Sequence, residues 1–428
     1  MELLKIKVGG FKNLKQNEIS LEPKVTALIS CNSYGKSNLL EAIEFGLGFM
    51  KCNEKNKRRL MGIPSFIPMN IVLQNEDFMF DLEGRLDKEG TAYIVQYGYS
   101  FEWQKDDGGR RIRKEYLKYK KEHDKKYTQL ISRDLQAFYK PSETARCTME
   151  ETIGQSELLL KKLADSEEVF YSFILNEIMS VSAVSLTDMD VNSYYNPKIL
   201  WDSDYDPDAL MQRNVAHSFE NLRKKHPETA DMLLDAYLQL FPNIVNVGVT
   251  VTDNRSLVKQ IESMEWPKDL PYTYVEKSYQ LVYRDKNMNQ PLGFHTLSDG
   301  ARRVFKILVD VASANAEGYD LILLEEPENC IHPALLNRFL IVLDQLSGSS
   351  NVIFASHSPY LVQFLKSGSL LIGKPNENGV ADFAPIKGSK IKSIEKDAER
   401  YSTSVGNYVF ELLSGSDDDI EALLGYLA

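Results

Sequence analysis

A short polar segment near the N-terminus has the residue types of a phosphate-binding loop. It covers residues 30–37 (SCNSYGKS) and ends in a Gly-Lys-Ser triplet. In such loops backbone N–H groups surround the phosphates, the lysine (Lys36) reaches the β- and γ-phosphates, and the hydroxyl (Ser37) binds magnesium. Ser30 and Ser33 stand where glycine is usual, and a serine held at positive φ costs about 1 kcal/mol. The alternative interpretation of the triplet is an ordinary helix start.

Two adjacent carboxylates, Glu325 and Glu326, follow the apolar run 321–324. Beside a phosphate loop, the first carboxylate would order the magnesium shell and the second would polarise the attacking water. Pro327 ends the strand sharply, which is typical of a site at the carboxyl edge of a sheet. The alternative is a pair of solvated glutamates.

Two further segments could bind anions. Ser298 and Gly300 precede a helix predicted from about Ala301, where a hydroxyl and an N–H group can hold an anion, although taken alone an ordinary helix cap is the favoured explanation. His357 follows the predicted strand 352–355 and could reach a γ-phosphate, although a lone histidine is more often structural.

The order of these segments strengthens the functional interpretation. Lys36 comes first, Glu326 follows Ser298 by 28 residues, and His357 follows Glu326 by 31 residues. Each lies at the end of a predicted strand or helix. Four weak patterns in one order therefore predict a single site.

The elements that must position these residues alternate between strand and helix. A strand over Leu3–Val8 is expected to end in a turn at Gly9-Gly10, and a buried strand over 25–29 leads through the loop into a helix. In the last third of the chain we expect strands at 321–324, 352–355 and 370–372, with helices from 301 and at 335–346 and 360–365. Such alternation predicts a parallel sheet covered on both faces.

The middle of the chain differs in residue composition and pattern. Residues 69–121 are rich in β-branched and aromatic side chains and predict an antiparallel meander, in which NIVLQ (70–74) is the first strand. Residues 156–241 are mostly helical in pattern, and strands return at 245–252 and 272–283. We therefore expect an N-terminal lobe (1–153), a helical insertion (154–242), a C-terminal lobe (243–400) and a short tail (401–428).

Composition sets the broad class. The 428 residues carry a net charge of −11, so a protein that coats nucleic acid over its whole surface is not expected. No apolar stretch is long enough to span a membrane and no signal peptide is recognisable, and four cysteines without CxxC spacing indicate a reducing cytoplasm. Acidic clusters at 202–208 and 417–419 are interpreted as a solvated loop and a solvated tail.

The motifs together resemble an ABC-type ATPase head of the SMC/RecF/OLD kind, over about residues 1–120 and 285–375. The resemblance rests on IKVGGFKNL, NSYGKSNLLEAI, FHTLSDGARRVFKIL, LILLEEPENCIHP and FASHSPYLV. It implies an α/β fold, a P-loop NTPase of ABC/SMC-head type, with a mixed sheet, an antiparallel β-meander and a helical insertion. Because the segment after His357 is short, we do not expect the Toprim nuclease domain of OLD proteins in it.

The resemblance also implies cofactors and roles. ATP and Mg²⁺ are the expected cofactors, with Ser37 and Glu325 at the metal, Glu326 as the catalytic base and His357 as the switch histidine. Ser298 and Gly300 would bind the γ-phosphate held by a second subunit. The remaining nucleotide-binding candidates are Asn32, Ser33, Tyr34, Gly35, Lys36, Asn38 and Lys12. Gln74 is either the Q-loop residue of the family or a solvated strand residue.

The implied function is an ATP-driven homodimer switch that acts on DNA or on a partner effector. Such heads resemble ATPase subunits of anti-phage systems such as Septu and PARIS, whose partner is a nuclease. A RecF-like DNA-repair protein and a non-hydrolysing scaffold are the alternatives. Ten basic and five acidic residues between Lys105 and Lys126, interleaved with tyrosines, could contact DNA phosphates or form a solvated hairpin.

Overall fold

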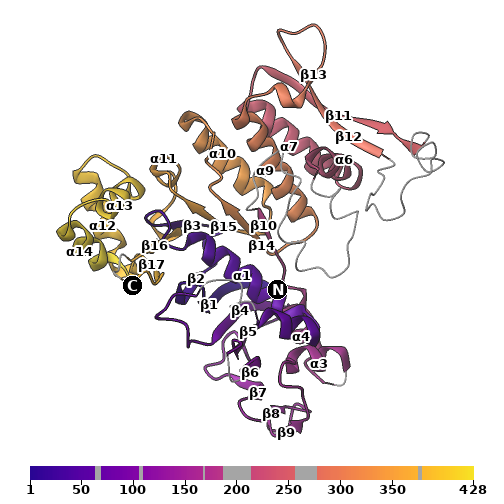
Figure 1. Ribbon diagram of the computed structural model, residues 1–428, viewed down its shortest axis with the longest axis vertical. Helices are drawn as coiled ribbons and strands as arrows, with labels where there is room; N and C mark the ends of the chain where they lie inside the picture. Colours follow the sequence, from indigo (N-terminus) through magenta and orange to yellow (C-terminus); the bar gives the residue numbers. More distant parts are fainter. Residues whose placement is uncertain (63–68, 106–108, 167–168, 187–213, 256–276, 375–377) are drawn as a thin grey trace. The chain divides into compact units, whose positions relative to one another are not determined.

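The computed structural model describes the chain except for six segments, and it divides the described residues into two compact units (Figure 1). The segments left out are 63–68, 106–108, 167–168, 187–213, 256–276 and 375–377. The first unit contains 1–185, 319–326 and 350–428, and the second contains 186–318 and 327–349. The boundary at 185 falls inside the stretch 154–242 that was expected as one helical insertion. The acidic cluster 202–208 lies outside the described residues.

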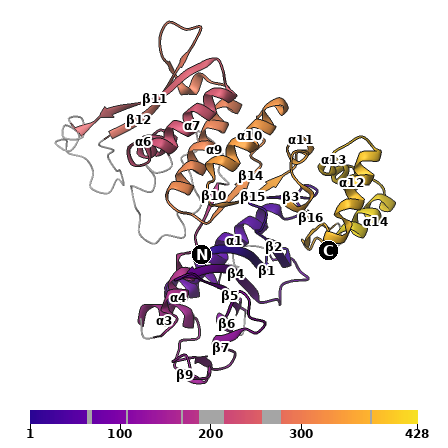
Figure 2. The same cartoon turned by 180° about the vertical axis from the view of Figure 1, so that it is seen from behind.

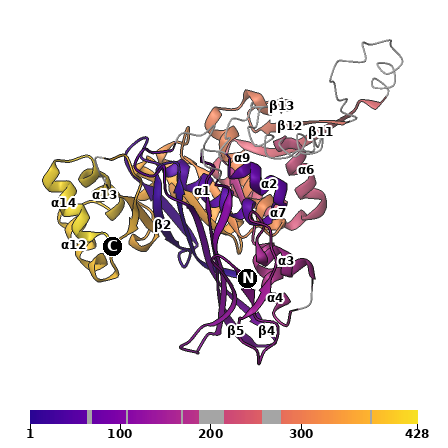
Figure 3. The same cartoon turned by 60° about the horizontal axis from the view of Figure 1, so that its bottom comes forward.

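An antiparallel sheet in the first unit has the strand order β2-β1-β4-β5-β6-β7-β8-β9. Figure 3 labels its strands β2, β4 and β5. Its strands are β1 (Glu2–Phe11), β2 (Leu14–Ser20), β4 (Phe78–Lys88), β5 (Thr91–Glu102), β6 (Arg111–Lys121), β7 (Thr128–Arg133), β8 (Ala137–Tyr139) and β9 (Met149–Glu151). The predicted meander is therefore confirmed from Phe78 onward, and it continues beyond the predicted end at 121.

Two local predictions in this sheet are wrong. β1 continues through Gly9-Gly10, and the turn comes only after Phe11. A Cβ atom at Gly10 would lie 2.0 Å from the Asp77 carbonyl oxygen, so the glycine permits a close approach of backbone rather than a turn. The stretch 70–74 forms a turn, with Leu73 N–H donating to the Asn70 carbonyl at 2.9 Å, and Gln74 is exposed in that turn rather than in a strand.

The second sheet of this unit is mainly parallel and has the order β10-β14-β15-β3-β16-β17. Its strands are β3 (Val25–Ile29), β10 (Ala183–Leu186), β14 (Leu321–Glu325), β15 (Asn351–Ser356), β16 (Leu370–Gly373) and β17 (Phe383–Pro385). β14, β15, β3 and β16 are parallel, whereas β17 is antiparallel to β16. The parallel sheet and its four predicted strands are confirmed, and the mixed α/β fold class with them.

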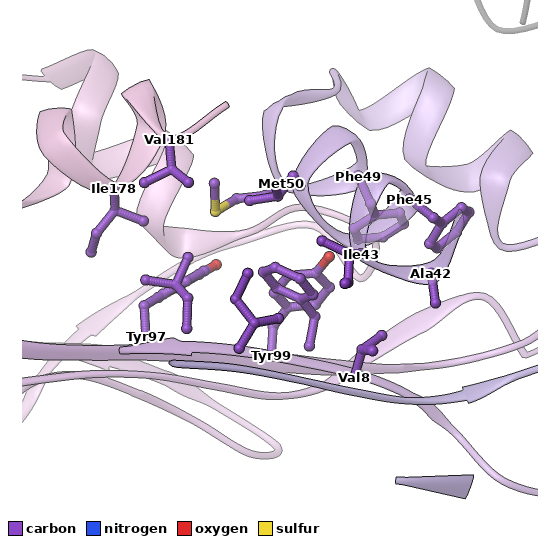
Figure 4. Close-up of a cluster of buried hydrophobic side chains, with 14 of the residues drawn as sticks. Val8, Ala42, Ile43, Phe45, Phe49, Met50, Tyr97, Tyr99, Ile178 and Val181 are labelled. Atoms are coloured by element: carbon purple, nitrogen blue, oxygen red, sulfur yellow. The ribbon is translucent and has the colours of Figure 1, made fainter. Parts of the chain in front are cut away.

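Helix α1 (Lys36–Lys51) joins the phosphate loop to the core. Figure 4 shows its apolar side chains, among them Phe45 and Phe49, above the inner face of the antiparallel sheet, where Tyr97 and Tyr99 lie. Phe49 stacks on Phe101 with the ring centroids 4.5 Å apart. The buried aromatic layer holds α1, and hence its N-terminal loop, in a fixed place on the sheet.

The other helices of the first unit pack near the sheets or form the C-terminal end. They are α2 (Glu54–Leu60), α3 (Leu159–Ser166), α4 (Ser172–Ser180), α11 (Pro359–Val362), α12 (Ile391–Arg400), α13 (Val405–Leu413) and α14 (Asp417–Tyr426), with α12–α14 side by side in Figure 2. The tail (401–428) is helical, and Asp417 and Asp418 are exposed to solvent. Asp417–Asp419 are the first turn of α14, where Ser416 and Asp419 form a capping box.

The second unit is built around α9 (Asp299–Ala316). Helices α6 (Val215–Lys225), α7 (Pro227–Leu240) and α10 (Pro333–Leu346) pack on it, and a small antiparallel sheet contains β11 (Ile244–Asp253), β12 (Lys277–Asp285) and β13 (Leu292–Gly293). Phe305 of α9 contacts the rings of Phe219 and Tyr237, with centroids 5.1 and 4.9 Å away. Among the described helices none is both long and apolar enough to cross a bilayer.

Candidate functional site

The register of three parallel strands brings the predicted residues to one edge of the sheet. Glu325 of β14 pairs with Ala355 of β15, and Ser356 of β15 pairs with Ile29 of β3. The residues that follow these strands therefore leave the sheet at the same carboxyl edge. They are the second glutamate, the histidine and the phosphate-loop segment, and all belong to the first unit.

Lys36 lies at the centre of this edge. Its side chain is buried, and the residue is only 5% exposed. The Nζ atom donates to the Ser30 carbonyl at 3.1 Å, to the Ser30 hydroxyl at 3.2 Å and to the Cys31 carbonyl at 3.2 Å. The ammonium is thus held inside the loop, as a lysine that binds phosphate must be.

His357 connects Lys36 to Glu326. Its Nδ1 lies 3.2 Å from the Lys36 Nζ, and its Nε2 lies 3.3 Å from the Glu326 Oε1. Because an ammonium group can only donate, Nδ1 accepts, and the ring proton is on Nε2, on the side of the carboxylate. Burial and the Lys36 charge lower the pKa of His357, although Glu326 opposes them, so the ring is neutral at neutral pH.

Three residues at the site adopt positive φ. Gly35 has φ 123°, Ser33 has φ 58° and Glu326 has φ 43°. The expected strain of a serine in the loop is therefore found at Ser33. Glu326 is held in its unusual conformation while its N–H donates to the Ala355 carbonyl at 2.9 Å. Strained non-glycine backbone of this kind gathers at functional sites.

Ser30, the other departure from the glycine pattern, is accommodated by a glycine on a neighbouring strand. A Cβ atom at Gly373 would stand 2.7 Å from the Ser30 Cβ and 2.5 Å from the Tyr34 Cε1. Both distances are shorter than side chains tolerate. The absence of a side chain at Gly373 therefore leaves the space that the serine and the tyrosine occupy.

Gly373→Ala is expected to destabilise the first unit by about 1–3 kcal/mol, because an added methyl group must displace the loop. The free energy of unfolding in urea measures this change. Gly368→Ala is the matched control, since a Cβ atom at Gly368 meets nothing within 4 Å. Equal stability of the two variants would contradict the close packing at the loop.

The other predicted loop residues differ in whether their side chains are free of packing contacts and exposed to a nucleotide. Asn32, Ser33 and Ser37 are exposed. The Tyr34 side chain instead contacts the β16–β17 region, where its hydroxyl hydrogen-bonds the Lys374 carbonyl and its ring meets Phe383 edge-on at 5.3 Å. Only the backbone of Tyr34 is therefore open to a nucleotide.

Two more candidates on neighbouring elements have partners of their own. The Asn38 amide donates to Asn13 Oδ1 at 2.8 Å. Lys12 forms an ion pair with Glu41 of α1. Binding of phosphate by Lys12 would have to compete with that carboxylate and stays a prediction. No feature of the sequence singled out Asn13, which contacts both Asn38 and the loop backbone.

Ser298 and Gly300 belong to the second unit. The Ser298 hydroxyl accepts the Ala301 N–H at 3.3 Å and caps α9, as the structural alternative predicted. A Cβ atom at Gly300 would lie 2.1 Å from the Cys330 carbonyl oxygen, so only glycine fits there. Their contact with a nucleotide on a second subunit remains a prediction.

The residues present fit a nucleotide with magnesium. A carboxylate at Glu325 and a hydroxyl at Ser37 are oxygen ligands of the kind that Mg²⁺ prefers. Among the described residues, no group of three or more His, Cys, Asp or Glu side chains could hold a metal ion without other ligands. Magnesium at this edge would therefore take its other ligands from phosphate and water, as it usually does in nucleotide sites.

Part of the basic segment 105–126 is already paired. Glu102 forms ion pairs with Arg111 at 2.7 Å, with Lys105 at 3.5 Å and with Arg113 at 3.7 Å. These cations and Arg110 lie at or before the beginning of β6. The exposed lysines further along the chain are Lys114, Lys121, Lys125 and Lys126.

Comparisons with known proteins agree with these motifs. Residues 25–363 match the family described as "AAA domain, putative AbiEii toxin, Type IV TA system". The DNA replication and repair protein RecF of Parabacteroides distasonis is 28% identical over 125 residues, which is 29% of this chain and 28% of RecF. RecF of Chlamydia caviae is 26% identical over 100 residues, 23% of this chain and 27% of RecF. The chain thus spans less than a third of the length of these relatives.

Solved structures of SMC heads are also similar to the chain. An SMC head bound to the C-winged helix domain of ScpA has a TM-score of 0.47 and 11% identity, with 91% of this chain and 99% of that chain covered. The SMC head domain from Thermotoga maritima has a TM-score of 0.41 and 13% identity, with 90% and 100% covered. The family match includes the phosphate loop, the signature segment, the paired glutamates and the histidine. The chain therefore belongs to this AAA-domain family, and the matched range contains the motifs that resemble an ABC-type ATPase head of the SMC/RecF kind.

Proposed function

We propose that the protein binds ATP with Mg²⁺ and hydrolyses it, and that two ATP-bound copies pair and separate again after hydrolysis. The observation that carries the proposal is the line of contacts from Lys36 through His357 to Glu326 at the carboxyl edge of the parallel sheet. A cation for phosphate and a carboxylate base thus lie on either side of one neutral imidazole.

Each residue of the site has a role in this proposal. Lys36 and the loop N–H groups would hold the phosphates, while Ser37 and Glu325 would hold the metal, which offsets the charge that develops on phosphate oxygen. Glu326 would accept the proton of the attacking water. His357, with its proton facing Glu326, would keep that carboxylate oriented. Because His357 also contacts Lys36, its position would depend on whether phosphate is bound.

Lys36→Ala is expected to weaken ATP binding by about 10- to 100-fold, because the ammonium makes charged hydrogen bonds to phosphate worth about 1.5–3 kcal/mol. Titration with a fluorescent ATP analogue measures binding, and release of inorganic phosphate measures turnover. Lys392→Ala, at an exposed lysine of α12, is the matched control and should behave as wild type. Equal binding by wild type and Lys36→Ala would remove the basis of the proposal.

Pairing of subunits is tested by sedimentation with and without ATP. The proposal expects a monomer without nucleotide and a dimer at saturating ATP, with Ser298 and Gly300 of each copy serving the nucleotide of the other. A monomer at saturating ATP would contradict the dimer switch. A nucleotide-independent dimer without ATP turnover would support the alternative of a non-hydrolysing scaffold.

The dimer would act on DNA or on an effector protein, such as a nuclease in anti-phage defence. The RecF similarity and the exposed lysines on and after β6 favour DNA. There, Lys118 lies over the ring of Tyr116 at 4.7 Å and Lys120 over that of Tyr127 at 5.2 Å. DNA affinity that falls steeply with salt and requires ATP would support this choice. Its absence would favour an effector protein.

A further inference from the structure

Asn13 joins three segments of the first unit through one side-chain amide. It lies in the turn between β1 and β2. Its Nδ2 donates to the Tyr34 carbonyl at 2.9 Å and to the Gly379 carbonyl at 3.1 Å, and its Oδ1 accepts the Asn38 amide at 2.8 Å. Its amide therefore bonds the phosphate loop at Tyr34, helix α1 at Asn38 and the connection that contains Gly379.

The bond to the Tyr34 carbonyl fixes the orientation of the next peptide N–H. A trans peptide is planar, and its C=O and N–H groups point in opposite directions. Holding the Tyr34 carbonyl toward Asn13 therefore holds the Gly35 N–H on the side away from Asn13. Backbone N–H groups of this part of a phosphate loop are the donors that surround the phosphates.

The Tyr34–Gly35 peptide lies in a part of the loop with unusual backbone conformation. Glycine imposes almost no preference on φ, and Gly35 stands at φ 123° beside Ser33 at φ 58°. A Cβ atom at Gly35 would lie 2.7 Å from the Asn13 Oδ1, so the amide occupies the space a side chain would need. Strained conformations persist only where the surroundings determine them.

Tyr34 is also anchored at its other end. Its hydroxyl lies 3.1 Å from the Asp382 N–H, which donates to it, and it hydrogen-bonds the Lys374 carbonyl. The phenol and the carbonyl of Tyr34 are thus held by different segments, and both contacts restrain the peptide that follows.

We propose that Asn13 is a positioning residue that presets the Gly35 N–H for phosphate binding. The inference rests on the proposed ATP binding and adds a residue to it that acts through the loop backbone. Because the same N–H would contact ground state and transition state alike, its loss should raise KM and leave kcat nearly unchanged.

A matched pair of asparagines tests this role. Asn70 donates its amide to the Asn378 carbonyl at 3.0 Å, on the same connection that Asn13 reaches at Gly379, but it has no bond to the phosphate loop among the contacts described. Asn13→Ala and Asn70→Ala therefore each remove a hydrogen bond to that connection, and only the first releases the Tyr34 carbonyl.

Asn13→Ala is expected to weaken binding of a fluorescent ATP analogue and to raise KM by about tenfold, with kcat within about twofold of wild type, whereas Asn70→Ala binds as wild type. Hydrogen exchange of the nucleotide-free loop, residues 30–38, should quicken only in Asn13→Ala. If that variant does not fold, Asn13→Asp keeps the shape and the acceptor for Asn38 but cannot donate to Tyr34, and the same results are expected.

The outcomes separate this inference from the proposed function. Wild-type affinity and wild-type loop exchange in the Asn13 variants would overturn the positioning role while leaving ATP binding intact. Equal effects of the Asn13 and Asn70 variants would also overturn it, because they would show general loss of packing. Failure of the wild-type protein to bind ATP would refute the proposed function, and the loop exchange would still decide whether Asn13 orders the loop.

Discussion

Glu326→Gln is expected to lower the rate of ATP turnover by about 10²–10⁴-fold while MgATP remains bound. A glutamine has the shape of the glutamate but cannot accept a proton from the attacking water, and positioned general bases contribute rate factors of this size. The amide can still face His357 Nε2 through its oxygen, so the geometry seen at 3.3 Å is preserved. ATP-bound dimers should therefore accumulate, which sedimentation at saturating ATP would reveal.

Glu22→Gln makes the same chemical change at an exposed residue before β3 and should leave turnover unchanged. Phosphate release and ATP binding are to be measured on the same preparations. A Glu326→Gln variant that hydrolyses ATP at the wild-type rate would exclude Glu326 as the base. A variant that no longer binds ATP would show instead that the carboxylate supports the structure of the site.

The grouping of the candidate residues at one edge of the parallel sheet was predictable from the residue types and from the topology. Short apolar runs before Ser30, Glu325 and His357 mark buried strands, and parallel strands place their carboxyl ends together. That rule places Lys36, His357 and Glu326 at one edge, whereas their side-chain contacts are seen only in the structure.

The failed predictions concern residues whose type allows two structures. Gly9 and Gly10 allow either a turn or close approach of neighbouring backbone, and the positions of Lys15 in β2 and of Asp77 before β4 decide. Asn13 is an ordinary turn residue in the sequence, and its contacts with Tyr34 and Asn38 arise only when distant segments meet. The helix at Asp417–Tyr426 was missed because three aspartates suggested solvent, although Ser416 and Asp419 have capping-box spacing.

A buried carboxylate in the antiparallel sheet supports the first unit away from the proposed site. Glu115 of β6 is 1% exposed. It accepts the N–H groups of Leu159 at 2.8 Å and Leu160 at 2.9 Å, which begin α3, and the Tyr97 hydroxyl at 3.1 Å. Burial raises the pKa of Glu115, although these donors and the nearby Arg133 charge oppose the effect.

Arg133 shares the same environment. Its guanidinium donates to the Glu157 carbonyl at 2.5 Å and to the Gly154 carbonyl at 3.0 Å, in the segment that leads into α3. The carboxylate and the guanidinium therefore hold the same helix start from two strands. Removing one of them leaves buried polar groups without their partner, which costs more than the bonds themselves.

Glu115→Ala is expected to destabilise the first unit by about 3–5 kcal/mol, because three buried donors lose their acceptor at about 1–3 kcal/mol each. Glu115→Gln should cost about 1–3 kcal/mol, because the amide retains one acceptor but places its NH₂ group against a backbone donor. Hydrogen exchange of residues 111–121 at increasing urea measures both, with Lys114→Ala at the exposed neighbouring position as control. If Glu115→Ala lowered the free energy of unfolding by less than about 1 kcal/mol, water or a shifted side chain would be replacing the carboxylate. Glu115 would then not be what stabilises the beginning of α3.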